Sequence, residues 1–120
     1  MAFIIIDLEF NNLSGIHKCI PNVYNDNPGL KNLELDNEII EIGAVKLDAH
    51  MQPCEELKVY IKPSVIPIIN PKILEITKIN IKDLENGVGF VEGINKLKEM
   101  VDEGDIICSW AKDDIAEIIR

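Results

Sequence analysis

The chain has 120 residues and a mass of 13.5 kDa, which suits one domain built around one hydrophobic core. Its formal net charge of -9 and its pI near 4.6 exclude a broad basic surface that would hold nucleic acid through many phosphate contacts, but leave room for a compact site that recruits cations. Because only 5% of the residues are aromatic, Ile, Leu and Val must fill most of the interior, which favours an α/β or α+β fold.

The cysteines and the N-terminus bear on the cellular compartment. Cys19, Cys54 and Cys108 are odd in number and widely spaced, so a disulfide framework or a Cys-rich zinc site is not expected. The apolar start is too short to span a bilayer, and it lacks the basic flank and the cleavage pattern of a signal peptide. We therefore expect a cytoplasmic protein without a membrane partner.

The first predicted element is a buried strand over residues 3–9, because this stretch is β-branched and almost continuously apolar. It ends in a D-x-E sequence formed by Asp7 and Glu9. The following residues, 11–36, are rich in Asn, Gly, Pro and Asp and have no sustained period. A long loop is expected there.

Two further strands are predicted over residues 38–48 and 56–63, where apolar and polar side chains alternate. The segment 48–55 between them suits a hairpin connection. Together with the first strand, these stretches predict a sheet that begins with a central strand and continues through an antiparallel pair.

Helical signals follow the third strand. Pro71 begins a short helix, and a second short turn ends at Gly87. Residues 90–101 repeat apolar side chains at helical spacing. A strand is predicted over residues 105–110, and the sequence KDDIAEIIR at 112–120 begins an amphipathic helix with acidic residues in its first turn.

Asp7 and Glu9 are the first candidate site residues. Side chains alternate along a strand, so both carboxylates point to one face with Cα atoms about 6 to 7 Å apart. That spacing lets them hold one hard cation, or two cations about 4 Å apart, and such ions can activate water for phosphodiester hydrolysis. The alternative is that the strand leaves the core here and its last side chains are ordinary solvated acids.

The sequences IDLEF, EIIEIGAVKLD, ITKI and SWAKDD occur in this order, with the helix that begins at Phe90 between the last two. This arrangement resembles the DEDD superfamily of 3′ to 5′ exonucleases, of the DEDDh type, over nearly the whole chain. It is most similar to the branch of the enhanced-RNAi exonucleases and the bacterial sporulation-inhibitor relatives. The resemblance implies a ribonuclease H-like α/β fold, with a mixed sheet of three antiparallel strands and then a parallel strand, flanked by helices.

The resemblance also implies the site. Asp7, Glu9 and Asp114 would be the catalytic metal ligands, with Asp113 as the less favoured neighbour of Asp114, and the complete site would hold two Mg²⁺ or Mn²⁺ ions. Glu9 and Phe10 would face the terminal nucleotide, where Phe10 stacks on a base; the alternative for Phe10 is a core position. The implied reaction releases nucleoside monophosphates from the 3′ end of single-stranded RNA or DNA.

The third family motif, a His followed five residues later by an Asp, is not found. His17 and His50 lie before the second motif, and His50 has no Asp five residues on. We therefore expect residues 1–120 to be the N-terminal portion of an exonuclease domain, without its last strand and closing helix, or a naturally shortened relative. Lys78 and Ala111 also stand where the family usually has Gly.

Two alternatives to an active exonuclease remain open at this point. A catalytically silent nucleic-acid-binding or regulatory module would keep the fold without the base. A polymerase-associated proofreading subunit would prefer mismatched DNA ends to RNA. Relatives of this type often dimerise, so a homodimer is a further expectation.

Overall fold

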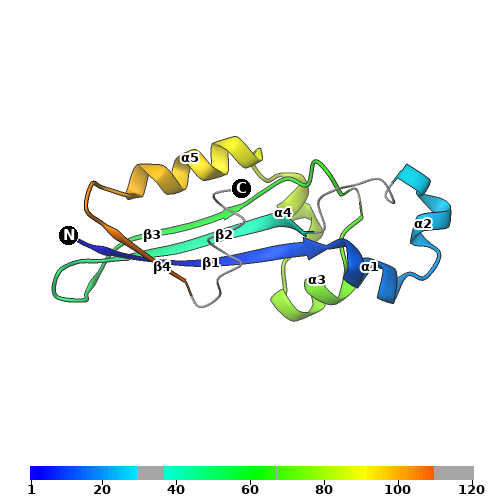
Figure 1. Cartoon of the computed structure of the whole chain (residues 1–120), viewed down its shortest axis with the longest axis horizontal. Coiled ribbons are helices and arrows are strands. Elements are labelled where there is room, and N and C mark those ends of the chain that lie inside the picture. The colour runs from blue at the N-terminus through cyan, green and yellow to red at the C-terminus, as the bar shows by residue number, and fades with distance from the viewer. Residues whose placement is uncertain (30–36, 67, 110–120) are drawn as a thin grey trace.

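A computed structural model describes residues 1–29, 37–66 and 68–109 of the chain. Four strands form one sheet in the order β3-β2-β1-β4 (Figure 1). The pairs β1/β2 and β2/β3 are antiparallel and the pair β1/β4 is parallel, which confirms the predicted mixed sheet. The elements are, in chain order, β1 (Phe3–Asn12), α1 (Leu13–Cys19), α2 (Val23–Asp26), β2 (Asn37–Leu47), β3 (Pro53–Tyr60), α3 (Pro71–Thr77), α4 (Ile81–Glu85), α5 (Phe90–Met100) and β4 (Ile106–Ser109).

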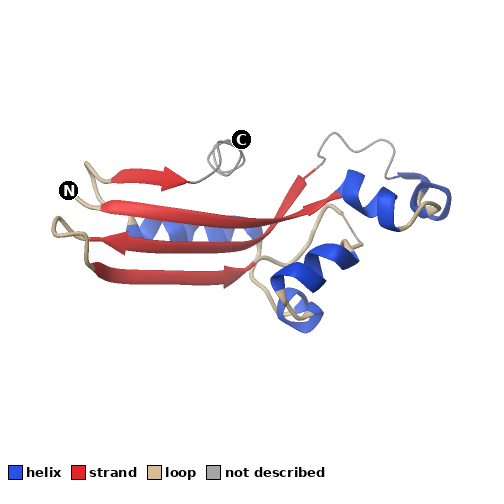
Figure 2. Ribbon diagram, turned by 90° about the horizontal axis from the view of Figure 1, so that it is seen from below, coloured by secondary structure: helices blue, strands red, loops and turns tan. Residues whose placement is uncertain are grey.

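Helix α5 covers one face of the sheet, as the view from below in Figure 2 shows. The main core lies between them, and its buried members come from three strands, the residue directly after β3 and the helix: Ile4, Ile6, Leu8, Ile39, Ile42, Ala44, Val59, Ile61, Leu97 and Met100. The helix approaches closely because it presents Gly93, where a Cβ would lie 2.2 Å from Cδ1 of Ile61. The predicted apolar face of this helix is confirmed at Leu97 and Ile94, whereas Phe90 at its start is 44% exposed.

The opposite face of the sheet is covered over only part of its length. Helices α3 and α4 pack against the end of the sheet where β1 finishes, around a second buried cluster of Ile40, Ile79 and Leu84. Figure 1 shows α3 on the other side of the sheet from α5. Ile5 and Val45 on the same face lie outside this cover and are half-buried. This face of the sheet is therefore covered by helices at the end where β1 finishes and open around Ile5 and Val45.

The stretch after β1 differs from the expected long loop. Strand β1 runs on to Asn12, and two short helices, α1 and α2, follow it. The Asn12 side chain accepts a hydrogen bond of 2.6 Å from the backbone N–H of Gly15, so it caps the start of α1. A small apolar cluster then holds the helices in place: Leu13, Ile16, Val23 and Ile66. The prediction is wrong for residues 11–26, because capping and this local cluster outweigh the polar composition; residues 30–36 lie outside the described part.

The remaining predicted elements are confirmed within one to three residues for the three sheet strands after β1 and for the helix that begins at Phe90. The short helix entered through Pro71 and the turn before Gly87 are present as α3 and α4. The helix expected over residues 112–120 lies outside the described residues. No helix that the structure describes is long and apolar enough to cross a membrane.

Lys78 ends helix α3 in a left-handed conformation, with φ 62° and ψ 16°, and its N–H donates to the carbonyl of Leu74. A side chain is disfavoured in this conformation, and Gly is the usual residue at such a helix end. The glycine that the resemblance implies at this position would adopt this conformation without such a cost.

We predict that Lys78→Gly raises the free energy of unfolding by about 0.5 to 1 kcal/mol, because relief of the left-handed strain exceeds the added freedom of the unfolded chain. Chemical denaturation with urea would measure the change. Lys72→Gly, inside helix α3, is the matched control and should destabilise by a similar amount. A loss of stability for Lys78→Gly would contradict the prediction.

A buried lysine ties the end of α5 to β2 and to the start of β4. Nζ of Lys46 donates to the Met100 carbonyl at 2.7 Å and to Oδ2 of Asp102 at 2.8 Å, and it lies 3.2 Å from Oδ2 of Asp105. Asp105 in turn accepts from the backbone N–H groups of Asp102 and Ala2. The pKa of Asp105 is lowered, first by the Asp102 N–H and also by Lys46, while the pKa of Lys46 is raised, first by its hydrogen bond to Asp102.

The lowered pKa of Asp105 predicts that the contacts of this carboxylate stabilise the fold less at acid pH. Because the folded carboxyl binds a proton less readily than the unfolded one, its stabilisation is present above the ordinary pKa of 3.8 and disappears as pH falls through the lower folded pKa. We expect Asp105→Asn to be less stable than the parent at pH 7 and to lose less stability between pH 5 and pH 2. Urea denaturation at both pH values measures this, with the exposed Glu103→Gln as control; parallel pH profiles would contradict it.

Candidate metal centre

Asp7 and Glu9 lie on the face of β1 that looks away from α5. Their neighbours Ile6 and Leu8 point into the main core, so the alternation of the strand places both carboxylates on the opposite, partly open face. Asp7 is exposed and Glu9 is half-buried. A register shift between Glu9 and Phe10 interrupts the pairing with β2 directly after the second carboxylate. The two acids therefore stand together where the regular part of the strand ends.

A glycine lies beside Asp7. Gly43 of β2 pairs with Asp7, and a Cβ at this position would come within 3.3 Å of the Asp7 backbone oxygen. Directly paired residues of antiparallel strands project to the same face, so the missing side chain leaves free space next to the Asp7 carboxylate. An open hollow of about 600 Å³ occupies this part of the sheet. It is lined by Ile5, Asp7, Glu41, Gly43, Ala44, Val45, Glu56, Leu57 and Lys58.

The same face carries further charges. Glu41 pairs with Glu9 across the strands, and Lys58 of β3 pairs with Gly43. Nζ of Lys58 lies 3.7 Å from Oε1 of Glu41 and 5.6 Å from the centre of the Tyr60 ring. The interaction with Tyr60, followed by the charge of Glu41, raises the pKa of the Lys58 ammonium. Lys58 is therefore positively charged at neutral pH, beside the carboxylate of Glu41.

The strand is fixed firmly just beyond the carboxylates. Asn11 is fully buried; its Nδ2 donates to the Ile68 carbonyl at 2.8 Å, and its Oδ1 accepts from the Asn70 N–H at 2.9 Å. The Asn70 side chain also caps α3, so β1 and α3 share one polar junction. Because a buried amide with both groups hydrogen-bonded is rarely free to move, these bonds at Asn11 fix the β1 backbone two residues after Glu9.

Phe10 lies on the other side of β1. It is partly buried and packs against the main core cluster, on the face that α5 covers. The structure therefore does not bring its ring beside the Asp7 and Glu9 carboxylates. Of the two alternatives that the sequence left open for this residue, the observed packing fits a core position.

The residues present fit part of a metal site. Carboxylate oxygens are the ligands that Mg²⁺ and Mn²⁺ prefer, and the gap at Gly43 leaves room for an ion beside Asp7. Residues 1–29, 37–66 and 68–109 contain no group of three or more potential ligands. The other expected ligand, Asp114, and its neighbour Asp113 lie outside the described residues. Asp7 and Glu9 thus offer two carboxylates on one face, and their role as metal ligands, like that of Asp114, is a prediction from the sequence.

Neither histidine lies beside the carboxylates. His17 is in the last turn of α1, where its ring packs against Tyr24 at an interplanar angle of 54°, with centroids 4.6 Å apart. His50 is in the turn between β2 and β3, at the end of the sheet where β1 begins. Both histidines are exposed at the surface. The described part of the chain therefore offers no imidazole to the candidate site.

The sequence did not identify three residues that lie on the same face as Asp7: Gly43, Glu41 and Lys58. Their place follows from the pairing register of β1, β2 and β3, which alternation alone leaves undetermined. The signal that could have found Gly43 is a glycine inside an otherwise regular strand pattern, which often marks close approach of a backbone or a ligand.

Comparison with known proteins gives a family match and a fold match. Residues 4–116 match the family model of the RNase T exonucleases. The nuclease domain of 3′hExo, a DEDDh family member, bound to rAMP, superposes with a TM-score of 0.70 at 20% identity, over 98% of this chain. Cell-death related nuclease 4 gives 0.67 at 15% identity over 93%, and E. coli exonuclease I in complex with a dA16 oligonucleotide gives 0.61 at 12% over 91%. No curated protein matches by sequence.

The solved relatives are longer than this chain. It spans 56% of the 3′hExo nuclease domain, 36% of cell-death related nuclease 4 and 20% of exonuclease I.

Proposed function

Since the chain belongs to the RNase T exonuclease family, we propose that it contributes to metal-dependent removal of nucleoside monophosphates from the 3′ end of single-stranded RNA or DNA. Its fold is that of the DEDDh exonucleases. The observation that carries the proposal is the pair Asp7 and Glu9, which stand on one face of β1 next to the space left by Gly43. Cytoplasmic location and a homodimer remain predictions.

Asp7, Glu9 and, from the sequence, Asp114 would hold Mg²⁺ or Mn²⁺. When bound, such ions supply an activated water and stabilise the leaving oxygen of a phosphodiester. The described residues contribute by fixing the positions of the two carboxylates. The Asn11–Asn70 junction fixes the backbone behind Glu9, and the missing side chain at residue 43 leaves the metal and the terminal phosphate accessible to Asp7.

A second candidate is a catalytically silent module that binds the 3′ end without cutting it. The observation that favours it is the position of His17 and His50, since neither lies beside the carboxylates.

The test uses single-stranded RNA and DNA labelled at the 5′ end. Incubation with the chain in Mg²⁺ or Mn²⁺ should shorten the oligonucleotide from its 3′ end one nucleotide at a time, and a chelator should stop the reaction. Binding without shortening would support the silent module. Absence of both binding and shortening, with either metal and either sugar, would overturn the proposal.

A further inference from the structure

The structure assigns a substrate-binding role to Lys58: we propose that this lysine binds a backbone phosphate of the nucleic-acid strand on the β3 side of Asp7 and Glu9. This inference rests on the proposed function, because it concerns the same site. It adds a residue that lies on a different strand from the carboxylates and outside the D-x-E sequence.

The position of Lys58 follows from the sheet register. Asp7, Gly43 and Lys58 form one row across β1, β2 and β3, and they project to the same face. Adjacent strands lie about 4.8 Å apart, so the Cα atoms of Asp7 and Lys58 are separated by about 10 Å. Because the residue between them is a glycine, no side chain separates the lysine from the Asp7 carboxylate. A phosphate bound at the Asp7 end of the row would have its neighbour within reach of Nζ.

The present contacts of Lys58 leave it available. Its side chain is 67% exposed, and the distance of 3.7 Å from Nζ to the Glu41 carboxylate is long for a charged hydrogen bond. The Tyr60 ring centre lies 5.6 Å from Nζ, and the interaction with the Tyr60 side chain is the first cause of the raised pKa of Lys58. The exposed member of the pair is Lys58, since the Glu41 side chain is only 14% exposed. Lys58 therefore lines the hollow with most of its side chain open to solvent.

The charged residues that line the hollow are mostly acidic, so Lys58 can reduce their repulsion of a nucleic-acid strand. Among the described residues that line it are the carboxylates of Asp7, Glu41 and Glu56 and a single cation, Lys58. A polyanionic strand that approaches these acids is repelled in a protein of net charge -9. Lys58, two strands away from Asp7 in the same row, would offset this repulsion with its positive charge.

The salt dependence of binding distinguishes this role from a structural one. Each phosphate contact to a single strand contributes about 0.7 to the slope of log K against log salt concentration. We expect Lys58→Met to reduce the slope by about 0.7 and to weaken binding of a labelled single-stranded DNA about fivefold at 0.1 M salt. Lys58→Arg should restore most of both. Fluorescence anisotropy in Ca²⁺, which replaces Mg²⁺ so that the strand stays intact, would measure these values.

Lys96→Met is the matched control. Lys96 is an exposed lysine of α5, on the other side of the sheet from Asp7, so its removal changes the net charge equally without touching the hollow. Equal slopes for the parent chain and for Lys58→Met overturn the assignment, and so does an equal change in Lys58→Met and Lys96→Met. If the parent chain binds no oligonucleotide with any metal, the proposed function fails and this assignment fails with it. Metal-dependent binding by the parent with an unchanged Lys58→Met slope overturns the assignment alone.

Discussion

Replacement of Asp7 by Asn together with Glu9 by Gln is expected to lower the affinity of the chain for Mn²⁺ at least about 100-fold. Loss of groups that only support metal ligands already weakens binding by about 10- to 100-fold, and these two carboxylates are proposed to touch the metal directly. The amides keep the size of the side chains but remove both negative charges. Isothermal titration calorimetry would measure the affinity, and circular dichroism would establish that the double variant is folded.

The control for this experiment is Glu92→Gln together with Glu99→Gln. Both glutamates are exposed on α5, so this double variant has the same net charge while the open face of the sheet is untouched. It should bind Mn²⁺ as the parent chain does. If the Asp7/Glu9 variant also binds normally, the metal site is elsewhere. Any nucleotide release by the parent chain should fall on the order of 10³-fold in the Asp7/Glu9 variant, since metal ions stabilise the transition state by several kcal/mol.

The second large effect is expected at Glu38, a buried carboxylate at the start of β2. Its Oε2 accepts hydrogen bonds from the N–H groups of Ser64 and Val65 at 2.8 and 3.0 Å, and its Oε1 accepts one from Ile66 at 2.9 Å. The Ser64 hydroxyl adds a fourth, longer contact of 3.3 Å. The Glu38 side chain thus binds three consecutive backbone N–H groups of the loop that follows β3, at residues 64–66.

We expect Glu38→Ala to lower the free energy of unfolding by about 3 to 5 kcal/mol. Hydrogen bonds to a charged group contribute about 1.5 to 3 kcal/mol each, and the buried N–H of Ile66 would lose its acceptor. Such a loss is a large part of the usual stability of a domain, about 5 to 15 kcal/mol. Urea denaturation would measure it.

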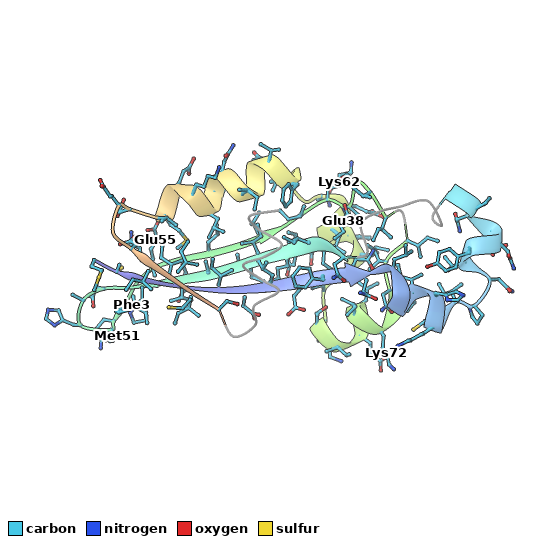
Figure 3. The ribbon with its side chains drawn as sticks, in the orientation of Figure 1. Phe3, Glu38, Met51, Glu55, Lys62 and Lys72 are labelled. Carbon is cyan, nitrogen blue, oxygen red and sulfur yellow. The ribbon has the colours of Figure 1, made fainter. Side chains whose placement is uncertain are left out.

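Two variants complete this test. Glu38→Gln keeps one acceptor oxygen and should cost less than Glu38→Ala. Glu55→Ala removes an exposed carboxylate of β3 at the other end of the sheet, as Figure 3 shows, and should change stability by no more than about 0.5 kcal/mol. A Glu38→Ala variant as stable as Glu55→Ala would show that the loop is held by other contacts.

Much of the sheet could be predicted because its strands carry a strong local signal. The apolar run at residues 3–9 and the alternation at residues 38–48 determine which side chains are buried, and the structure confirms both strands. The D-x-E spacing also placed Asp7 and Glu9 on one face correctly. These features depend on neighbours in sequence, which a single chain displays.

Other features depend on contacts between distant residues and could not be predicted in this way. Asn11 looks like a loop residue by composition, but it is buried because Ile68 and Asn70 satisfy its amide from 57 and 59 positions away. Lys58 reaches the site only through a pairing register set across three strands. The position of Asp114 relative to Asp7 depends on residues outside the described part, so its role as a ligand stays a prediction.

The mixed sheet has a consequence for the order in which the chain folds. Strands β1, β2 and β3 form a meander of near neighbours, whereas β4 pairs with β1 across 103 positions, Phe3 with Ile106. Closing so long a loop carries a larger entropic cost, so the β1/β4 pairing is expected to form late. Asp7, Glu9, Gly43 and Lys58 all belong to the meander. Pulsed hydrogen exchange should therefore find their amides protected before those of β4, with the site strands assembled before the sheet is complete.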